Sequence, residues 1–169
     1  TYTGGEPVLG SQTGQPFIGA ALGYTGNLGN TRSEILSLID TSVGADGTFP
    51  TGTFHYLQTG DAARSSPRHG LYTAAVNKIT ASGGTAVKSI GPSLPSGGSV
   101  VTGAMSGFAT ADIAGAAFTF APGAFADHLP SFAATFDNAS QTKMSRWISK
   151  GAVGTFGAIE EPCNYPSKF

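Results

Sequence analysis

A single thiol and an imidazole stand where two short apolar segments of the chain end. Residues 116–120 run towards Asp127 and His128, and residues 152–159 run towards Glu161 and Cys163. A thiolate is the nucleophile of cysteine-dependent hydrolysis, and a neighbouring imidazole lowers the pKa of the thiol and carries its proton. The catalytic residues predicted from this pattern are His128 as general base, Cys163 as nucleophile, and Asp127 or Glu161 as an orienting carboxylate.

This chemistry sets a condition on the fold. The two apolar segments must be parallel neighbours in one sheet, joined by a helix over residues 140–150, because the carboxyl ends of parallel strands meet at the same edge. Backbone amides near Gly123 or Gly157 are candidates for the oxyanion site. The competing interpretation is structural: a solitary Cys is usually a small buried hydrophobe, and His128 beside Asp127 is then a hydrogen-bonding pair. We interpret His55 and His69 as structural.

Hydrophobic periodicity and turn residues predict the elements that must hold these groups. A capping box from Thr31 to Glu34 begins a helix that ends near Gly44, and Ser66-Pro67 begins a second helix that ends at Gly83. Residues 121–131 read as a turn that bears His128. The segments predicted as strands are short and apolar or β-branched: 17–24, 53–59, 85–90, 99–105, 116–120 and 152–159.

Alternation of these strands with amphipathic helices predicts an α/β fold with a mostly parallel sheet and helices on both faces. Residues 1–16, rich in Gly, Thr and Pro, are expected to form an extended arm. Residues 17–169 are expected to form one α/β domain.

Composition excludes several classes of protein. The chain has 169 residues, a net charge of −1 and 11% charged residues. Near-zero charge argues against a nucleic-acid binder, and no apolar run is long enough for a membrane span. Low charge and a start at Thr1 without an initiator Met are typical of a processed, secreted or cell-envelope protein. One cysteine allows no internal disulfide.

Known cofactor and metal motifs do not occur, so we expect no cofactor and no metal. Gly97-Gly98 lacks the Lys-Ser/Thr of a phosphate loop, and no GxSxG, HExxH or EF-hand pattern is present. The acidic and imidazole groups that a metal would use are Asp127, His128, Glu160 and Glu161, but their spacing matches no metal motif.

The C-terminal third resembles an uncharacterised family of secreted bacterial proteins. The motifs that carry the resemblance are PGAFADHLPSF (residues 122–132), Arg146-Trp147, and GAVGTFGAIEEPCN followed by Lys168-Phe169. The similarity extends over residues 17–169, with specific motifs only after about residue 100. The family pattern continues beyond both ends of this sequence, which implies that the chain is a fragment of a larger domain.

The order strand–His, helix, strand–Cys also resembles the gingipain and caspase clan of cysteine peptidases. That resemblance implies a three-layer sandwich and a peptide or protein substrate. The chain departs from the clan pattern at Leu129, where Gly usually follows the His, and at Pro162, where a small residue usually precedes the Cys. The alternative function is a non-catalytic extracellular structural protein that assembles with itself or with another chain that completes its sheet.

Overall fold

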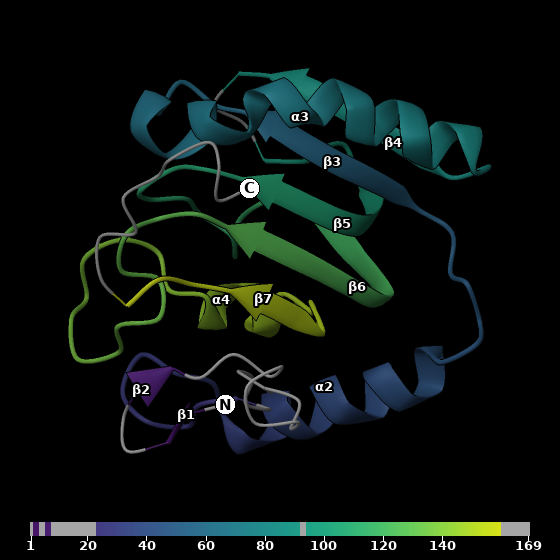
Figure 1. The fold of residues 1–169 in the computed structure, drawn as a ribbon. Helices are drawn as coiled ribbons and strands as arrows, with labels where there is room; N and C mark the ends of the chain where they lie inside the picture. Colours follow the sequence, from purple (N-terminus) through teal and green to yellow (C-terminus); the bar gives the residue numbers. More distant parts are fainter. Residues whose placement is uncertain (1, 4–5, 8–22, 92–93, 160–169) are drawn as a thin grey trace.

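Five parallel strands form the central sheet of the computed structural model, which describes residues 2–3, 6–7, 23–91 and 94–159 (Figure 1). The strand order is β4-β3-β5-β6-β7, and every neighbouring pair is parallel. The predicted parallel α/β sheet is therefore confirmed. The strands are β3 (Thr53–Gln58), β4 (Thr85–Ile90), β5 (Ser99–Ser106), β6 (Phe118–His128) and β7 (Gly154–Phe156).

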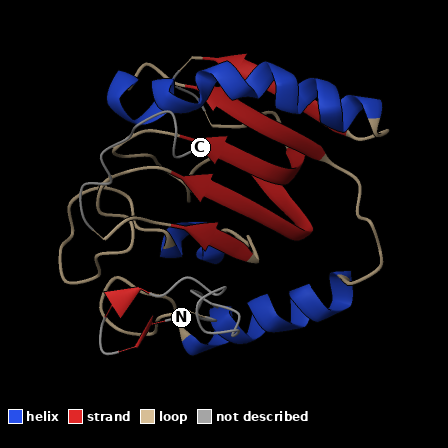
Figure 2. Cartoon of the chain, viewed as in Figure 1, coloured by secondary structure: helices blue, strands red, loops and turns tan. Residues whose placement is uncertain are grey.

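Within the described part of the chain, three helices accompany the sheet: α2 (Arg32–Ala45), α3 (Ala62–Ala81) and α4 (Ser145–Ser149). Asp127 pairs with Arg68 of α3, whereas the ring of its neighbour His128 packs against Trp147 of α4. Consecutive residues of a strand point to opposite faces, so α3 and α4 lie on opposite faces of the sheet (Figure 2). Near the N-terminus, β1 (Tyr2–Thr3) and β2 (Glu6–Pro7) form a separate antiparallel pair.

Helix α2 begins as its capping box predicts. The Thr31 hydroxyl accepts the Glu34 amide, and the Glu34 carboxylate accepts the Thr31 amide. The apolar side of this helix is only partly covered: Ile35, Leu38 and Ile39 are half-buried, no residue of α2 is fully buried, and Val43 is 72% exposed. The helix lies at the margin of the sheet and contacts β6 and α4 along a narrow strip (Figure 1).

Helix α3 begins earlier than predicted. Asp61, not Ser66, is the N-cap residue, and its side chain accepts the Arg64 amide at 3.3 Å. Pro67 therefore lies inside the helix. The predicted end is confirmed, because the helix stops at Ala81 and Gly83 follows with φ +84°.

Strand β6 is longer than predicted and contains His128 as its last residue, so the predicted turn over residues 121–131 is wrong. The pairing with β5 jumps from Val101↔Phe120 to Gly103↔Phe125, which accommodates extra residues of β6 as a bulge. Gly123, with φ +81°, supplies the left-handed backbone at this bulge. Pro122-Gly123 therefore bends the strand without ending it.

Two further predicted segments are shorter in the structure, and a third falls only partly within the described residues. The helix expected over residues 140–150 is α4, a single turn and a half from Ser145 to Ser149, and the strand expected over 152–159 is β7. The strand expected over 17–24 falls mostly outside the described residues, and the described Gly23 and Tyr24 are exposed and not in a strand.

The main core lies on the α4 face of the sheet. Trp147 is fully buried there and contacts the rings of Phe120 and His128. Val101, Ala104 and Ala126 of the central strands, together with Phe108 and Ile113 of the following loop, pack in the same cluster. This core holds the ends of β5 and β6 in a fixed relation to each other. No helix in the described part of the chain has the length and apolarity that crossing a bilayer requires.

Candidate functional site

The carboxyl ends of β3, β5 and β6 meet at one edge of the sheet. The chain leaves β3 at Thr59, leaves β5 at Gly107 and leaves β6 after His128. Strand β4 lies beside β3 on one side, whereas β6 and β7 follow β5 on the other. The strand order therefore reverses between β3 and β5, and ligands of open α/β sheets bind in the crevice at such a point.

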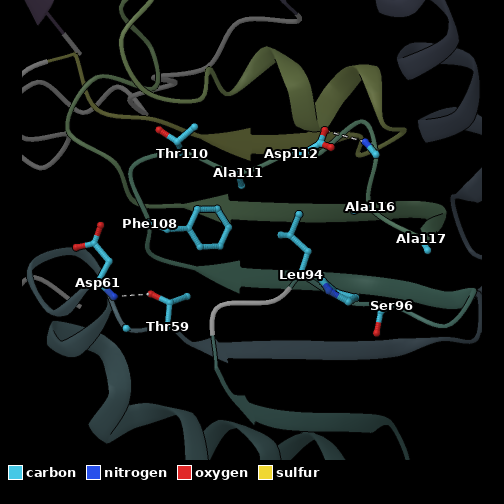
Figure 3. Close-up of a pocket in the computed structure, with 13 residues that line it drawn as sticks. Thr59, Asp61, Leu94, Ser96, Phe108, Thr110, Ala111, Asp112, Ala116 and Ala117 are labelled. Atoms are coloured by element: carbon cyan, nitrogen blue, oxygen red, sulfur yellow. Dashed lines mark hydrogen bonds between the residues drawn. The ribbon is translucent and has the colours of Figure 1, made fainter.

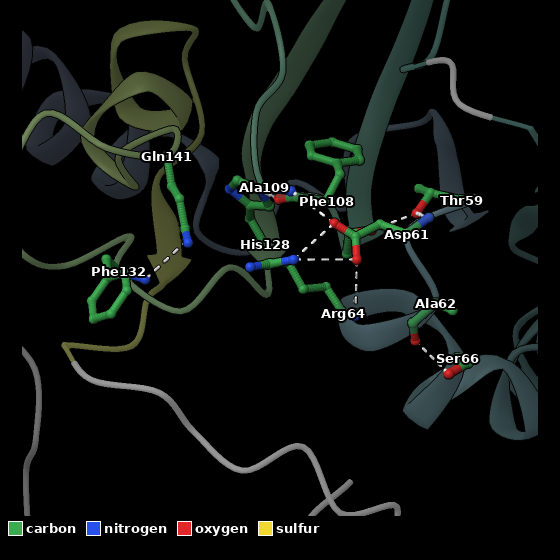
Figure 4. A network of polar contacts seen from close by, with 11 residues as sticks. Thr59, Asp61, Ala62, Arg64, Ser66, Phe108, Ala109, His128, Phe132 and Gln141 are labelled. Atoms are coloured by element: carbon green, nitrogen blue, oxygen red, sulfur yellow. Dashed lines mark hydrogen bonds and ion pairs between the residues drawn. The ribbon is translucent and has the colours of Figure 1, made fainter.

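Hydrogen bonds tie the β3–α3 turn to the loop that leaves β5. The Thr59 hydroxyl donates to the Gly107 carbonyl at 2.5 Å, and the Thr59 amide donates to the Ser65 hydroxyl at 3.0 Å. The Asp61 carboxylate accepts the Ala109 amide at 3.2 Å and pairs with the Arg64 guanidinium at 3.1 Å (Figure 4). These bonds pre-organise the edge, because two side chains of the β3–α3 turn, those of Thr59 and Asp61, hold the backbone of the loop that leaves β5.

Gly107 allows this close approach. A Cβ at this position would lie 2.0 Å from the Arg64 carbonyl oxygen and 2.4 Å from its carbon, which are backbone atoms. No side chain fits there without movement of either α3 or β5. The start of α3 therefore rests directly on the backbone at the end of β5.

His128 is held in a defined tautomer beside this edge. Its Nε2 lies 2.7 Å from the Phe108 carbonyl oxygen, which can only accept, so Nε2 carries the proton. Nδ1 of the neutral ring is then an acceptor, and it is buried without a partner among the described residues. Burial lowers the pKa of His128 to about 4; the bond to Phe108 opposes this shift, and the charges of Arg68 and Arg64 add to it.

Asp127 does not contact His128, because the two side chains lie on opposite faces of β6. The Asp127 carboxylate pairs with the Arg68 guanidinium at 2.5 Å, and Arg68 also donates to the Ser106 carbonyl at 2.9 Å. Arg68 is 2% exposed. A backbone carbonyl, that of Phe108, therefore orients the imidazole in the place where the sequence suggested a carboxylate.

Two of the predicted catalytic residues, Glu161 and Cys163, lie outside the described residues. The fold meets the condition that their proposed role sets: β6 and β7 are parallel neighbours, with α4 between them along the chain. In the register of β6 with β7, Asp127 lies opposite Phe156, so β7 ends beside the end of β6. The chain thus leaves β7 at the edge that carries His128.

A pocket of about 600 Å³ opens at the crossover between β3 and β5 (Figure 3). Phe108 and Leu94 lie side by side in its middle, and Asp61 and Asp112 stand towards opposite ends. Phe108 links the pocket to His128, because its ring lines the pocket and also packs against the imidazole with centroids 4.8 Å apart. Sequence reasoning missed this pocket, since Thr59-Gly60-Asp61 and Gly107-Phe108 stand out only once the strand order is known.

A second imidazole near this edge has a structural role. The buried Ser65 hydroxyl accepts the Thr59 amide and is hydrogen-bonded to His69 Nε2. Burial lowers the pKa of His69, and the charge of Lys88 lowers it further. Ser65 is fully buried. The pair fixes the first turns of α3.

Within residues 23–91 and 94–159, no group of three or more His, Cys, Asp or Glu side chains is placed to hold a metal ion. No protein-family model, curated protein or solved structure matches the chain. The function must therefore be argued from the carboxyl edge itself.

Proposed function

We propose that this chain is an extracytoplasmic hydrolase of the cysteine-peptidase type, in which His128 is the general base and Cys163 the nucleophile. One observation carries the proposal. His128, the last residue of β6, donates from Nε2 to the Phe108 carbonyl, and this bond leaves Nδ1 as a buried, unprotonated nitrogen without a partner among the described residues. A base that must take a proton from a thiol needs such a free nitrogen.

The proposed reaction is acyl transfer through a thioester. Nδ1 takes the proton of the Cys163 thiol, and the thiolate attacks the carbonyl carbon of a peptide bond. The imidazolium then returns the proton to the leaving amine, and water hydrolyses the thioester to release the acid and regenerate the thiol. Near pH 7 the buried ring is neutral, as this step requires, and a thiolate beside it would raise its pKa from about 4.

The thiol of Cys163 provides the direct test, because the reactivity of a cysteine follows its ionisation. We expect the rate of alkylation by iodoacetamide, measured from pH 5 to pH 10, to give an apparent thiol pKa below the ordinary value of about 8.5. In a His128→Gln variant the profile should move back towards that value. His69→Gln is the matched control, and it should leave the profile unchanged.

Equal profiles for the original chain and His128→Gln would reject the pairing of the two residues. A thiol that does not react until the chain is unfolded would reject the nucleophile. Hydrolysis of a casein substrate that is lost in Cys163→Ser and in His128→Gln, but kept in His69→Gln, would complete the argument for catalysis.

A second candidate function is non-catalytic assembly, and an exposed apolar surface favours it. Phe125 and Phe156 lie on the α3 face of the sheet beyond the cover of α3, and Phe156 is 66% exposed. Beside them a groove of about 680 Å³ contains Phe49, Phe54 and Phe125. Sedimentation velocity should show self-association that Phe156→Ser weakens; a monomer at high concentration would reject this candidate.

A further inference from the structure

The pocket at the crossover between β3 and β5 has a chemistry of its own, which does not depend on Cys163. Its volume of about 600 Å³ falls in the range of small-molecule sites. Two of its walls are fixed by hydrogen bonds: the Thr59 hydroxyl donates to the Gly107 carbonyl, and the Asp61 carboxylate accepts the Ala109 amide. The site is therefore built before any ligand arrives.

The middle of the pocket is apolar. Leu94 and Phe108 occupy its centre, and Ala111, Ala116 and Ala117 add further apolar lining (Figure 3). Partly buried Leu94, Ala111 and Ala116 pack directly on the main core. This surface suits a ring or alkyl chain, which would gain by leaving water.

Among the described residues that line the pocket, the charged side chains are two carboxylates, Asp61 and Asp112. Asp61 caps α3 and is already satisfied, because it accepts the Arg64 and Ala109 amides and pairs with the Arg64 guanidinium. It thereby occupies the position that an anion would take at the start of α3. An anionic ligand would find the helix N-terminus filled and two negative charges in the lining.

Asp112 is the acceptor that stays open to a ligand. One of its oxygens accepts the Gly115 amide at 2.9 Å, and the side chain is otherwise exposed at the pocket. Lys150 stands behind this turn and donates to the carbonyls of Ala114 and Ala116, but it does not line the pocket. The Asp112 carboxylate can therefore accept a further hydrogen bond from a ligand, and a cationic donor would make the strongest one.

We propose that this pocket binds an organic cation: an amine or guanidinium carried on an apolar ring or chain. The apolar body lies over Phe108 and Leu94, and the cationic group reaches the Asp112 carboxylate. The probes are benzylamine and two neutral or anionic relatives of the same size, benzyl alcohol and benzoate.

Titration of the isotope-labelled chain, followed by amide NMR shifts, tests the proposal. Benzylamine should bind and shift amides within residues 59–61 and 108–117. Asp112→Asn should weaken benzylamine roughly threefold to fivefold, as expected for one exposed charge pair, and leave benzyl alcohol unaffected. Asp40→Asn, which removes an exposed carboxylate of α2, is the control and should change neither affinity.

The variant is chosen so that folding is not in question, because asparagine keeps the side-chain oxygen that accepts the Gly115 amide. Benzoate or benzyl alcohol binding as tightly as benzylamine would overturn the proposal. So would benzylamine shifts confined to other parts of the chain, no shifts up to 20 mM, or an affinity that Asp112→Asn leaves unchanged.

Discussion

Asp127 and His128 are neighbours in sequence, but β6 places their side chains on opposite faces of the sheet. The carboxylate meets Arg68 of α3, and the imidazole meets the Phe108 carbonyl in the core around Trp147. The two residues therefore do separate work. Asp127 holds a helix to the sheet, while His128 places a neutral, buried imidazole at the carboxyl end of β6.

The pairing of Asp127 with Arg68 predicts a large loss of stability on removal of the charge. Asp127→Asn leaves the guanidinium of Arg68, 2% exposed, without its carboxylate. We expect a loss of roughly 2–4 kcal/mol, below the value for a fully buried pair because the Asp127 side chain is 22% exposed. Urea unfolding measures it, with Asp40→Asn as the control. A loss below about 0.5 kcal/mol would show that solvent screens the pair.

The buried imidazole of His128 predicts a pH dependence of stability. Its pKa is about 4 in the folded chain and 6.5 as an ordinary side chain, so the unfolded state binds the extra proton between these values. Stability is complete above about pH 6.5 and falls as the pH falls towards 4. By pH 5 this group alone should cost about 2 kcal/mol.

His128→Gln isolates this contribution, because glutamine keeps an N–H donor for the Phe108 carbonyl and does not titrate. The free energy of unfolding of the variant should fall less between pH 7 and pH 5 than that of the original chain. Burial also lowers the pKa values of His55 and His69, but their effect is common to both proteins. If the free energies of unfolding of the two proteins changed equally with pH, the imidazole would have an ordinary pKa, as in water.

The two ends of α3 show how far local sequence reaches. Gly83 ends the helix as predicted, because a left-handed backbone just beyond the last turn is a local requirement. The start was misplaced, because Ser66-Pro67 is a good local signal that tertiary contacts override. Asp61 caps the helix while it also holds the Ala109 amide, and that second partner is distant in sequence.

The candidate site divides in the same way. The parallel arrangement of β6 and β7 followed from alternation of strands and helices, and it is confirmed. The carbonyl partner of His128 and the pocket between β3 and β5 were not predictable, because both depend on strand order. Pro122-Gly123 led to a prediction of β6 that was too short, because Pro and Gly occur both in turns that end strands and in bulges within them.

Two glycines predict opposite responses to the same substitution. Gly107→Ala places a Cβ 2.0 Å from the Arg64 carbonyl oxygen, so the end of β5 and the start of α3 must move apart. We expect a loss of about 2 kcal/mol or more. Gly70→Ala, inside α3 with no atom within 4 Å of the added carbon, should stabilise by roughly 0.5–1 kcal/mol. Thermal unfolding measures both, and two changes of the same sign would contradict the close approach at Gly107.

We expect helix α2 to unfold locally while the sheet stays folded. No residue of α2 is fully buried, and the turn before it supplies part of its attachment. There Asn30 donates to the Ser145 carbonyl at 2.9 Å and to the Ser149 hydroxyl at 3.2 Å. Asn30→Ala removes both bonds and should raise the hydrogen-exchange rates of α2 amides roughly fivefold to thirtyfold, equivalent to about 1–2 kcal/mol.

Amides of β5 and β6 should keep their protection in the same experiment, because their core on the α4 face contains no α2 side chain. Asn27→Ala is the matched control: its amide reaches the Phe136 carbonyl only at 3.5 Å and is exposed. Equal loss of protection in α2 and in the central strands would show that α2 unfolds with the sheet as one cooperative unit. Loss confined to α2 would identify it as a separable element beside the groove that contains Phe49 and Phe125.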